Sequence, residues 1–331
     1  MKATVLLLLA AGCREAPPPR RLVLAAFTAP QEVYEESIFP AFREHWQAET
    51  GETIELVGSF RASGAQTRAL LAGFPADVAA LSLEPDLDQL AQAGLIRHDW
   101  RAEPDGGVVS SSLVALALRP GNPKGLRTWD DLNREDLGIL TPDPHSSGGA
   151  MWNIAAIHGA VLRAGTPAPA RGEAVSEALI AGVLSRVTRM DRGARESMLA
   201  FEQGEGDVAI TYESEILAAQ AHGQRVERLI PASTLRVENP AAVLDSGVDA
   251  HGTRDVAEAF VRFLHTPEAQ ALFAHHGYRP LGATAGNDER FPVPADLFTI
   301  RDLGGWPRVQ TELFDPDGLY ERALRRAREA R

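Results

Sequence analysis

Short apolar runs alternate with amphipathic stretches along the first third of the chain. Residues 22–27 form a continuous apolar run that predicts a buried strand. Residues 31–50 carry apolar side chains at helical spacing, with a kink expected at Pro40 and an end expected at Gly51. Further strands are predicted at residues 54–57 and 76–81, and further helices at residues 65–72 and 86–93. Because strands that alternate with helices are typical of parallel βαβ units, the pattern predicts an α/β fold.

The same alternation continues beyond residue 113. The apolar run at residues 113–118 predicts a strand, and a turn rich in proline and glycine follows it. Later strands are predicted at residues 137–141, 208–212 and 241–244, and later helices at residues 151–163, 197–203, 255–264 and 267–275. The chain ends in an arginine-rich predicted helix, which we interpret as a solvated face or a docking patch. We find no internal repeat, and the pattern does not show which strands share a sheet.

The length and the charge narrow the class of protein. A chain of 331 residues is long enough for about two domains with cores of their own. Its 33 Lys and Arg residues face 45 Asp and Glu residues, which gives a formal net charge of −12. This acidic balance argues against a nucleic-acid-binding protein and against adsorption to an anionic membrane.

The N-terminal segment has the pattern of a secretion signal. In residues 1–13, Lys2 precedes a short apolar run that ends in Ala10-Ala11-Gly12-Cys13. This ending resembles a lipobox, which predicts lipidation of Cys13; the alternative is an ordinary secretion signal with an incidental cysteine. Residues 14–21, with three consecutive prolines, are expected to form an extended tether. Since Cys13 is the only cysteine, no intrachain disulfide and no cysteine-ligated zinc site is expected.

Four segments share one local design, in which small residues immediately precede a predicted helix. They are Ser63-Gly64, Ser147-Gly148-Gly149, Gly193-Ala194 and Thr28-Ala29-Pro30. The start of a helix has free backbone N–H groups and a partial positive charge, and small residues let a ligand approach them closely. Each segment alone is an ordinary helix cap. If several of them converge, they would form an anion site that contains no basic side chain.

One of these segments belongs to a longer motif. The run Thr141-Pro-Asp-Pro-His-Ser-Ser-Gly-Gly-Ala-Met-Trp-Asn153 resembles that of the periplasmic sulfate/thiosulfate-binding proteins of ABC transporters. Further segments fit the same family in the same order, at residues 42–51, 121–124, 129–132, 191–195, 206–210 and 278–280. The resemblance covers residues 22–310, and jointly these matches are specific.

The resemblance implies a two-lobe periplasmic binding protein fold of type II, with two α/β lobes joined by two crossing strands. The run at residues 113–118 suits one crossing and residues 241–244 suit the return. The implied organisation is a signal peptide at 1–13, a tether at 14–21, lobe 1 at 22–112, lobe 2 at 113–240, and the rest of lobe 1 with a C-terminal helix at 241–331.

The resemblance also implies the ligand and the residues that bind it. The family holds dehydrated sulfate with backbone N–H groups, serine hydroxyls and an indole N–H, without a counter-cation. The positions matched to these donors are Ser63, Gly64, Ser147, Gly148, Gly149, Gly193, Ala194 and Tyr212. Tyr212 stands where the family commonly has tryptophan, and a phenol accepts hydrogen bonds as well as donating them. Thr28 and Arg195 are further candidates, because the acidic residue that pairs with this arginine in the family is absent here.

The chemistry of the anion agrees with a site made of donors. Sulfate carries no proton at neutral pH and needs donors only, whereas hydrogen phosphate is best recognised by a site that also has a carboxylate. No acidic residue lies within Ser63-Gly64 or Ser147-Gly148-Gly149. The expected protein is a monomeric, lipid-anchored, extracytoplasmic protein that passes sulfate or thiosulfate to an ABC permease, with no catalytic residue, cofactor or metal.

Other functions stay open from the sequence. Molybdate or tungstate would differ from sulfate mainly in size, and a sensory or interaction protein could keep the fold without transport. A hydrolase built on His145-Ser146-Ser147 lacks a GxSxG elbow. A metal site at His275-His276 is disfavoured because neighbours on a helix point to different sides.

Overall fold

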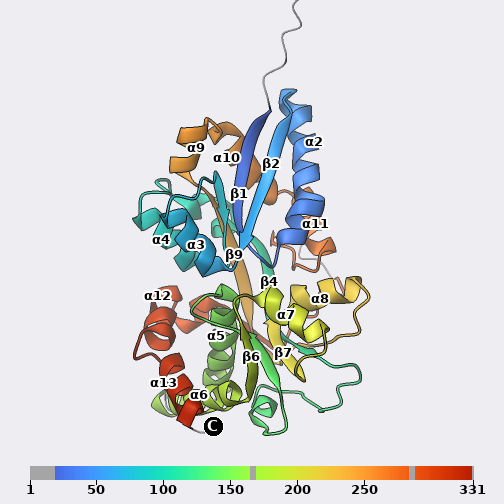
Figure 1. Cartoon of the computed structure of the whole chain (residues 1–331), viewed down its shortest axis with the longest axis vertical. Helices are drawn as coiled ribbons and strands as arrows, with labels where there is room; N and C mark the ends of the chain where they lie inside the picture. Colours follow the sequence, from blue (N-terminus) through green and yellow to red (C-terminus); the bar gives the residue numbers. More distant parts are fainter. Residues whose placement is uncertain (1–18, 165–168, 283–287, 330–331) are drawn as a thin grey trace, which may run out of the picture.

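The computed structural model describes residues 19–164, 169–282 and 288–329, which form two lobes stacked along the long axis of the molecule (Figure 1). Two long strands, β4 (Val108–Leu118) and β9 (Ser233–Val243), run antiparallel to each other through the centre and connect the lobes. One sheet extends through both lobes in the strand order β2-β1-β3-β9-β4-β7-β5-β6. The two-lobe α/β fold predicted from the sequence is confirmed.

The first lobe is built around a short parallel sheet. Strand β1 lies between β2 and β3 and is parallel to both, and β3 pairs antiparallel with the far end of β9. Its elements are β1 (Arg20–Phe27), α1 (Gln31–Val33), η1 (Tyr34–Ile38), α2 (Phe39–Thr50), β2 (Ile54–Arg61), α3 (Ser63–Leu71), β3 (Val78–Ala80), α4 (Glu84–Gln92), η2 (Trp100–Ala102), η3 (Pro104–Gly107), α9 (Asp245–His251), α10 (Arg254–Leu264) and α11 (Pro267–His275).

Both faces of this sheet are covered, which explains why β3 and residues 22–27 of β1 are apolar throughout. Leu24 and Ala26 point to one face, into a core that includes residues of α2 and α10. Ala25 points to the other face, into a smaller core shared with residues of α3 and α4. Since successive side chains of a strand alternate between faces, a strand buried on both sides has no polar positions to mark its period.

The second lobe repeats this arrangement on the other half of the central strands. Strand β5 lies parallel to β6 and β7, and β7 pairs antiparallel with β4. Its elements are η4 (Asp130–Asn133), β5 (Ile139–Pro142), α5 (Gly148–Arg163), α6 (Pro169–Arg186), β6 (Val187–Asp191), α7 (Ala194–Glu202), β7 (Val208–Tyr212), α8 (Glu213–Ala221) and β8 (Glu227–Leu229).

The irregularity expected at Pro40 is present one turn earlier than the proline itself. Residues Tyr34–Ile38 form a π-helical turn, and Pro40 lies in the first turn of the regular helix that follows. A proline has no N–H and its ring clashes with the carbonyl four residues back, so the widened turn removes the conflict. The helix then ends at Gly51, in the left-handed conformation that favours glycine.

The C-terminal segment belongs to the second lobe, which differs from the sequence-based division. Residues 245–278 pack into the first core as expected. From residue 296 onward, however, the chain packs against α5 and α6, with Trp306 against Trp152 at a ring separation of 4.8 Å. The elements of this segment are β10 (Asp296–Phe298), η6 (Ile300–Leu303), α12 (Trp306–Val309), η7 (Gln310–Phe314) and α13 (Leu319–Glu329). Strand β10 sets this position by pairing with the second-lobe end of β9.

The return of the chain to the second lobe is held by a buried ion pair. Arg279 donates to both carboxylate oxygens of Glu213, at 2.6 and 3.1 Å, and its backbone N–H donates to the carbonyl of Ser111. Glu213 is fully buried and also accepts from Arg228. The pair therefore ties the end of the first-lobe segment to the start of α8.

Among the described residues, no helix has the length and apolar character needed to cross a membrane. The predicted signal peptide, the lipobox with Cys13 and residues 14–18 of the tether lie outside the described residues.

The seating of the C-terminal segment on the second lobe can be tested at Gly159 in α5. A methyl group at this position would collide with the ring of Phe298, so we expect Gly159→Ala to lower the free energy of unfolding by roughly 1–3 kcal/mol. Chemical denaturation measures the change. Glu44→Ala, on the exposed face of α2, serves as a control expected to stay within about 0.5 kcal/mol of the parent protein. Equal stability of Gly159→Ala and the control would contradict this packing.

Candidate functional site

The segments singled out from the sequence meet where the two lobes face each other. A Cβ atom at Gly64 in the first lobe would lie 3.2 Å from the carbonyl oxygen of Ser146 in the second lobe. A Cβ atom at Gly148 would lie 2.8 Å from the hydroxyl oxygen of Ser82, across the same boundary. In Figure 1 this is the region where α3 of the upper lobe approaches the start of α5 in the lower lobe. The lobes thus touch without space for a side chain at these glycines.

The other second-lobe segments surround Gly149. A Cβ atom there would lie 3.1 Å from the methyl group of Ala194, 3.2 Å from the hydroxyl of Tyr212 and 3.3 Å from the hydroxyl of Ser147. A Cβ atom at Gly193 would lie 3.4 Å from the hydroxyl of Thr28, which connects the fourth segment to the group. The structure therefore brings together, around one boundary, all the candidate positions except the guanidinium of Arg195.

The helices that begin here have no side-chain caps. Helix α3 follows Ala62, α5 follows Ser147 and α7 follows Gly193, and none of these three residues accepts a hydrogen bond from the helix through its side chain. The first N–H groups of a helix have no acceptor within the helix, so uncapped starts keep donors and a partial positive charge. Three such starts near one point favour an anion.

Ser82 is a site residue that the sequence analysis missed. It lies two residues after the end of strand β3, and its backbone N–H donates to the hydroxyl oxygen of Ser63 at 2.9 Å. Its carbonyl accepts from the indole of Trp152 at 2.9 Å and from the amide of Asn239 at 3.1 Å. Its hydroxyl lies 2.8 Å from that of Tyr212. The signal in the sequence is one polar residue where an apolar strand ends, the usual place for binding residues in α/β folds.

Ser63 has a second partner inside the first lobe. Its hydroxyl donates to the carboxylate of Asp86 at 2.5 Å, and both side chains are buried. Burial raises the pKa of Asp86 to about 6, against the hydrogen bonds from Ser63 and Thr67, which lower it. The charge of Arg68 also lowers the pKa of Asp86, and its guanidinium lies beside Gly64, 3.4 Å from the position of a Cβ atom.

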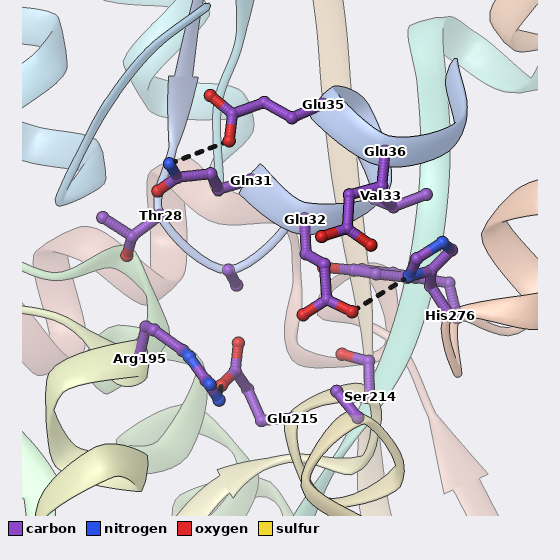
Figure 2. A pocket seen from close by; sticks show the side chains of 13 residues that line it. Thr28, Gln31, Glu32, Val33, Glu35, Glu36, Arg195, Ser214, Glu215 and His276 are labelled. Atoms are coloured by element: carbon purple, nitrogen blue, oxygen red, sulfur yellow. Dashed lines mark hydrogen bonds and ion pairs between the residues drawn. The ribbon is translucent and has the colours of Figure 1, made fainter. Parts of the chain in front are cut away.

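Arg195 has acidic partners in the structure, although the acidic residue that pairs with it in the family is absent from this sequence. Its guanidinium lies 3.2 Å from the carboxylate of Glu215 and 3.3 Å from that of Glu202. Figure 2 shows it reaching toward Glu215 in a neighbouring cavity of about 280 Å³, whose lining also includes Thr28 and Glu32. Burial raises the pKa of Glu215 to about 7. The charge of Arg195 is therefore shared with acidic groups of its own lobe.

The arrangement of the histidines agrees with neither a hydrolase nor a metal site. The two ring nitrogens of His145 lie 2.8 Å from the carboxylates of Asp143 and Glu321, so neither faces a serine hydroxyl. Within the residues that the structure describes, no three His, Cys, Asp or Glu side chains are placed to hold a metal ion. What the site offers is hydrogen-bond donors on two facing surfaces.

Comparison with known proteins agrees with this architecture. The chain is 39% identical to a sulfate-binding protein of Synechococcus elongatus over 309 residues, which cover 92% of this chain and 86% of the relative. It is 31% identical to a thiosulfate-binding protein of Pseudomonas aeruginosa over 290 residues, or 85% of this chain and 86% of the relative.

A solved structure gives the same result at the level of the fold. The sulfate-binding protein SubI from Mycobacterium tuberculosis H37Rv superposes with a TM-score of 0.81 and 35% identity, covering 89% of this chain and all of that chain. The family resemblance inferred from the sequence motifs is thereby confirmed. The family model described as bacterial extracellular solute-binding protein matches residues 22–279, and the chain belongs to this family.

Proposed function

We propose that this protein binds sulfate, or thiosulfate, between its lobes and delivers it to an ABC permease. The observation that carries the proposal is the convergence of three uncapped helix starts with the hydroxyls of Ser147 and Tyr212 at one boundary. The relatives at 31–39% identity that are named for sulfate or thiosulfate support the choice of anion. As a binding protein, the chain would catalyse no reaction.

The donors are sufficient in strength for such a ligand. A hydrogen bond to a charged group contributes roughly 1.5–3 kcal/mol, so a handful of them offsets the cost of taking the anion out of water. The overall charge of −12 repels an anion, so the attraction has to be local. Each lobe supplies part of the set of donors, so a bound anion would favour the closed arrangement of the lobes.

The location outside the cytoplasm follows from the family, and we propose that a lipid at Cys13 anchors the protein there. The first described strand, β1, begins at Arg20 at the end of the first lobe that lies away from the second lobe (Figure 1). An anchor joined to this end would leave the cleft and both rims free for the permease. Metabolic labelling with a palmitate analogue in cells, with Cys13→Ser as the control, would test the anchor.

Calorimetry of the desalted protein tests the proposed ligand. We expect saturable binding of sulfate or thiosulfate with a Kd in the micromolar range or below, and much weaker binding of phosphate. Titrations with molybdate and tungstate measure how strictly the site selects by size. Saturable binding of phosphate without binding of sulfate would refute the assignment.

The second-lobe glycines can be tested by adding a charge. We expect Gly148→Asp to abolish sulfate binding, because the new side chain would meet Ser82 across the cleft and place a carboxylate where the anion sits. Gln224→Asp, in an exposed loop of the same lobe, adds the same charge and should bind like the parent protein. Circular dichroism checks that both variants are folded. Unchanged affinity in Gly148→Asp would remove this helix start from the site.

The buried carboxyl behind Ser63 predicts a dependence of stability on pH. The folded state keeps the proton of Asp86 up to a pKa of about 6, whereas the unfolded state releases it near the ordinary value of 3.8. The folded state therefore binds more protons in this interval, and stability is lost as the pH rises through it. Asp86→Asn removes this loss. The unfolding free energy of this variant relative to the parent protein should therefore grow by roughly 2–3 kcal/mol between about pH 4 and about pH 8.

Chemical denaturation at both pH values measures this difference, and groups common to both proteins cancel. Asp88→Asn, on the same helix, removes an exposed carboxylate that pairs with Arg101 and should change the difference by less than about 1 kcal/mol. A difference between the parent protein and Asp86→Asn that does not vary with pH would show that Asp86 titrates normally.

A further inference from the structure

A pair of buried hydroxyls from different lobes lies at the candidate anion site. The hydroxyl oxygens of Ser82 and Tyr212 are 2.8 Å apart, and each residue is only 1% exposed. The Tyr212 hydroxyl also lies 3.2 Å from the position of a Cβ atom at Gly149, among the second-lobe donors. The phenol thus has one neighbour in the first lobe and faces the start of α5 in its own lobe.

The phenol of Tyr212 can act as a donor or as an acceptor toward a ligand, whereas the position of Ser82 is fixed by its own hydrogen bonds. A phenol hydroxyl can donate one hydrogen bond and can also accept, and burial raises the pKa of Tyr212 well above its ordinary value, so it keeps its proton. The N–H and carbonyl groups of Ser82 are both engaged, with Ser63, Trp152 and Asn239. These bonds hold the Ser82 backbone from both lobes and from β9, so its hydroxyl is kept next to the phenol.

The acidities of the two hydroxyls decide which way the protons point when an anion is present. A phenol is a stronger acid than an alcohol, so it forms the stronger hydrogen bond to a negatively charged acceptor. The best arrangement has Ser82 donating to the phenol oxygen and the phenol donating to the anion, since each bond in such a chain strengthens the next. In this arrangement the phenol oxygen already accepts a hydrogen bond from Ser82, so it is a poor acceptor for a hydrogen bond from a protonated ligand.

We propose that Ser82 is a positioning residue that sets the specificity of the site by making Tyr212 a donor. The site then takes fully deprotonated tetrahedral oxyanions and discriminates against protonated ones such as hydrogen phosphate. This inference rests on the proposed function, because it assigns the selectivity of the same anion site. Ser82 acts through Tyr212: by occupying the phenol oxygen as an acceptor, it leaves the phenol to act toward the ligand as a donor.

The test is a set of variants titrated with sulfate and with inorganic phosphate by calorimetry. Removing the phenol hydroxyl in Tyr212→Phe should weaken sulfate binding by roughly 10–150-fold, the range for a hydrogen bond to a charge. Removing the Ser82 hydroxyl in Ser82→Ala should weaken sulfate binding by only about 5-fold. It should also strengthen phosphate binding relative to sulfate, because the phenol becomes free to accept. The double variant should bind sulfate as Tyr212→Phe does, because Ser82 acts only through the phenol.

A second variant covers the case in which Ser82→Ala is too unstable to titrate. An indole N–H only donates, so Tyr212→Trp no longer depends on Ser82. We expect Tyr212→Trp and Tyr212→Trp/Ser82→Ala to show the same ratio of sulfate to phosphate affinity. A ratio that falls when Ser82 is removed in this background would overturn the inference.

The outcomes separate this inference from the function on which it rests. If the parent protein binds sulfate and Ser82→Ala weakens the binding of sulfate and of phosphate equally, Ser82 has a structural role only. The inference then fails, while the proposed function stands. If the parent protein binds neither sulfate nor thiosulfate, the proposed function fails and the inference with it. If the parent protein binds sulfate and Ser82→Ala has a lower ratio of sulfate affinity to phosphate affinity, the result supports both the proposed function and the inference about Ser82.

Discussion

Backbone N–H groups at helix starts need acceptors, and this requirement organises the boundary between the lobes. Helices α3, α5 and α7 begin there without a side-chain cap, and their starts lie near one another. The glycines at these starts let the two lobes come into contact, since a methyl group at Gly148 would already meet Ser82 of the other lobe. The N–H groups at these helix starts are therefore available to an anion that lies between the lobes.

At the boundary, the role of each hydroxyl depends on the partner to which it donates. Each hydroxyl has one proton, and the partner that receives it determines what the hydroxyl offers to a third group. Ser63 directs its proton to Asp86, and Ser82 and Tyr212 share one hydrogen bond. Arg195, by contrast, is balanced within its own lobe by Glu202 and Glu215. The site is therefore set by the directions of a few protons more than by net charge.

Much of this architecture could be predicted from the sequence, because it depends on local patterns. Apolar runs such as residues 22–27 and small residues before helices, as in Ser147-Gly148-Gly149, specify strands and helix starts directly. Ser82 and Asp86 were missed because a serine at a strand end and an acid in an amphipathic helix are common, and only their distances distinguish them. The position of residues 296–329 was predicted wrongly, since it depends on the pairing of β10 with one end of β9.

The placement of the C-terminal segment has a mechanical consequence. The chain crosses between the lobes in β4, in β9, and a third time at Tyr278 and Arg279, where Arg279 pairs with Glu213. This third connection lies beside the other two, because Arg279 also pairs with Ser111 of β4. Three adjacent connections restrict twisting between the lobes more than two do, and they still allow bending about one line. The lobes would therefore open and close by bending about one axis, and each closure would bring the same donor groups together.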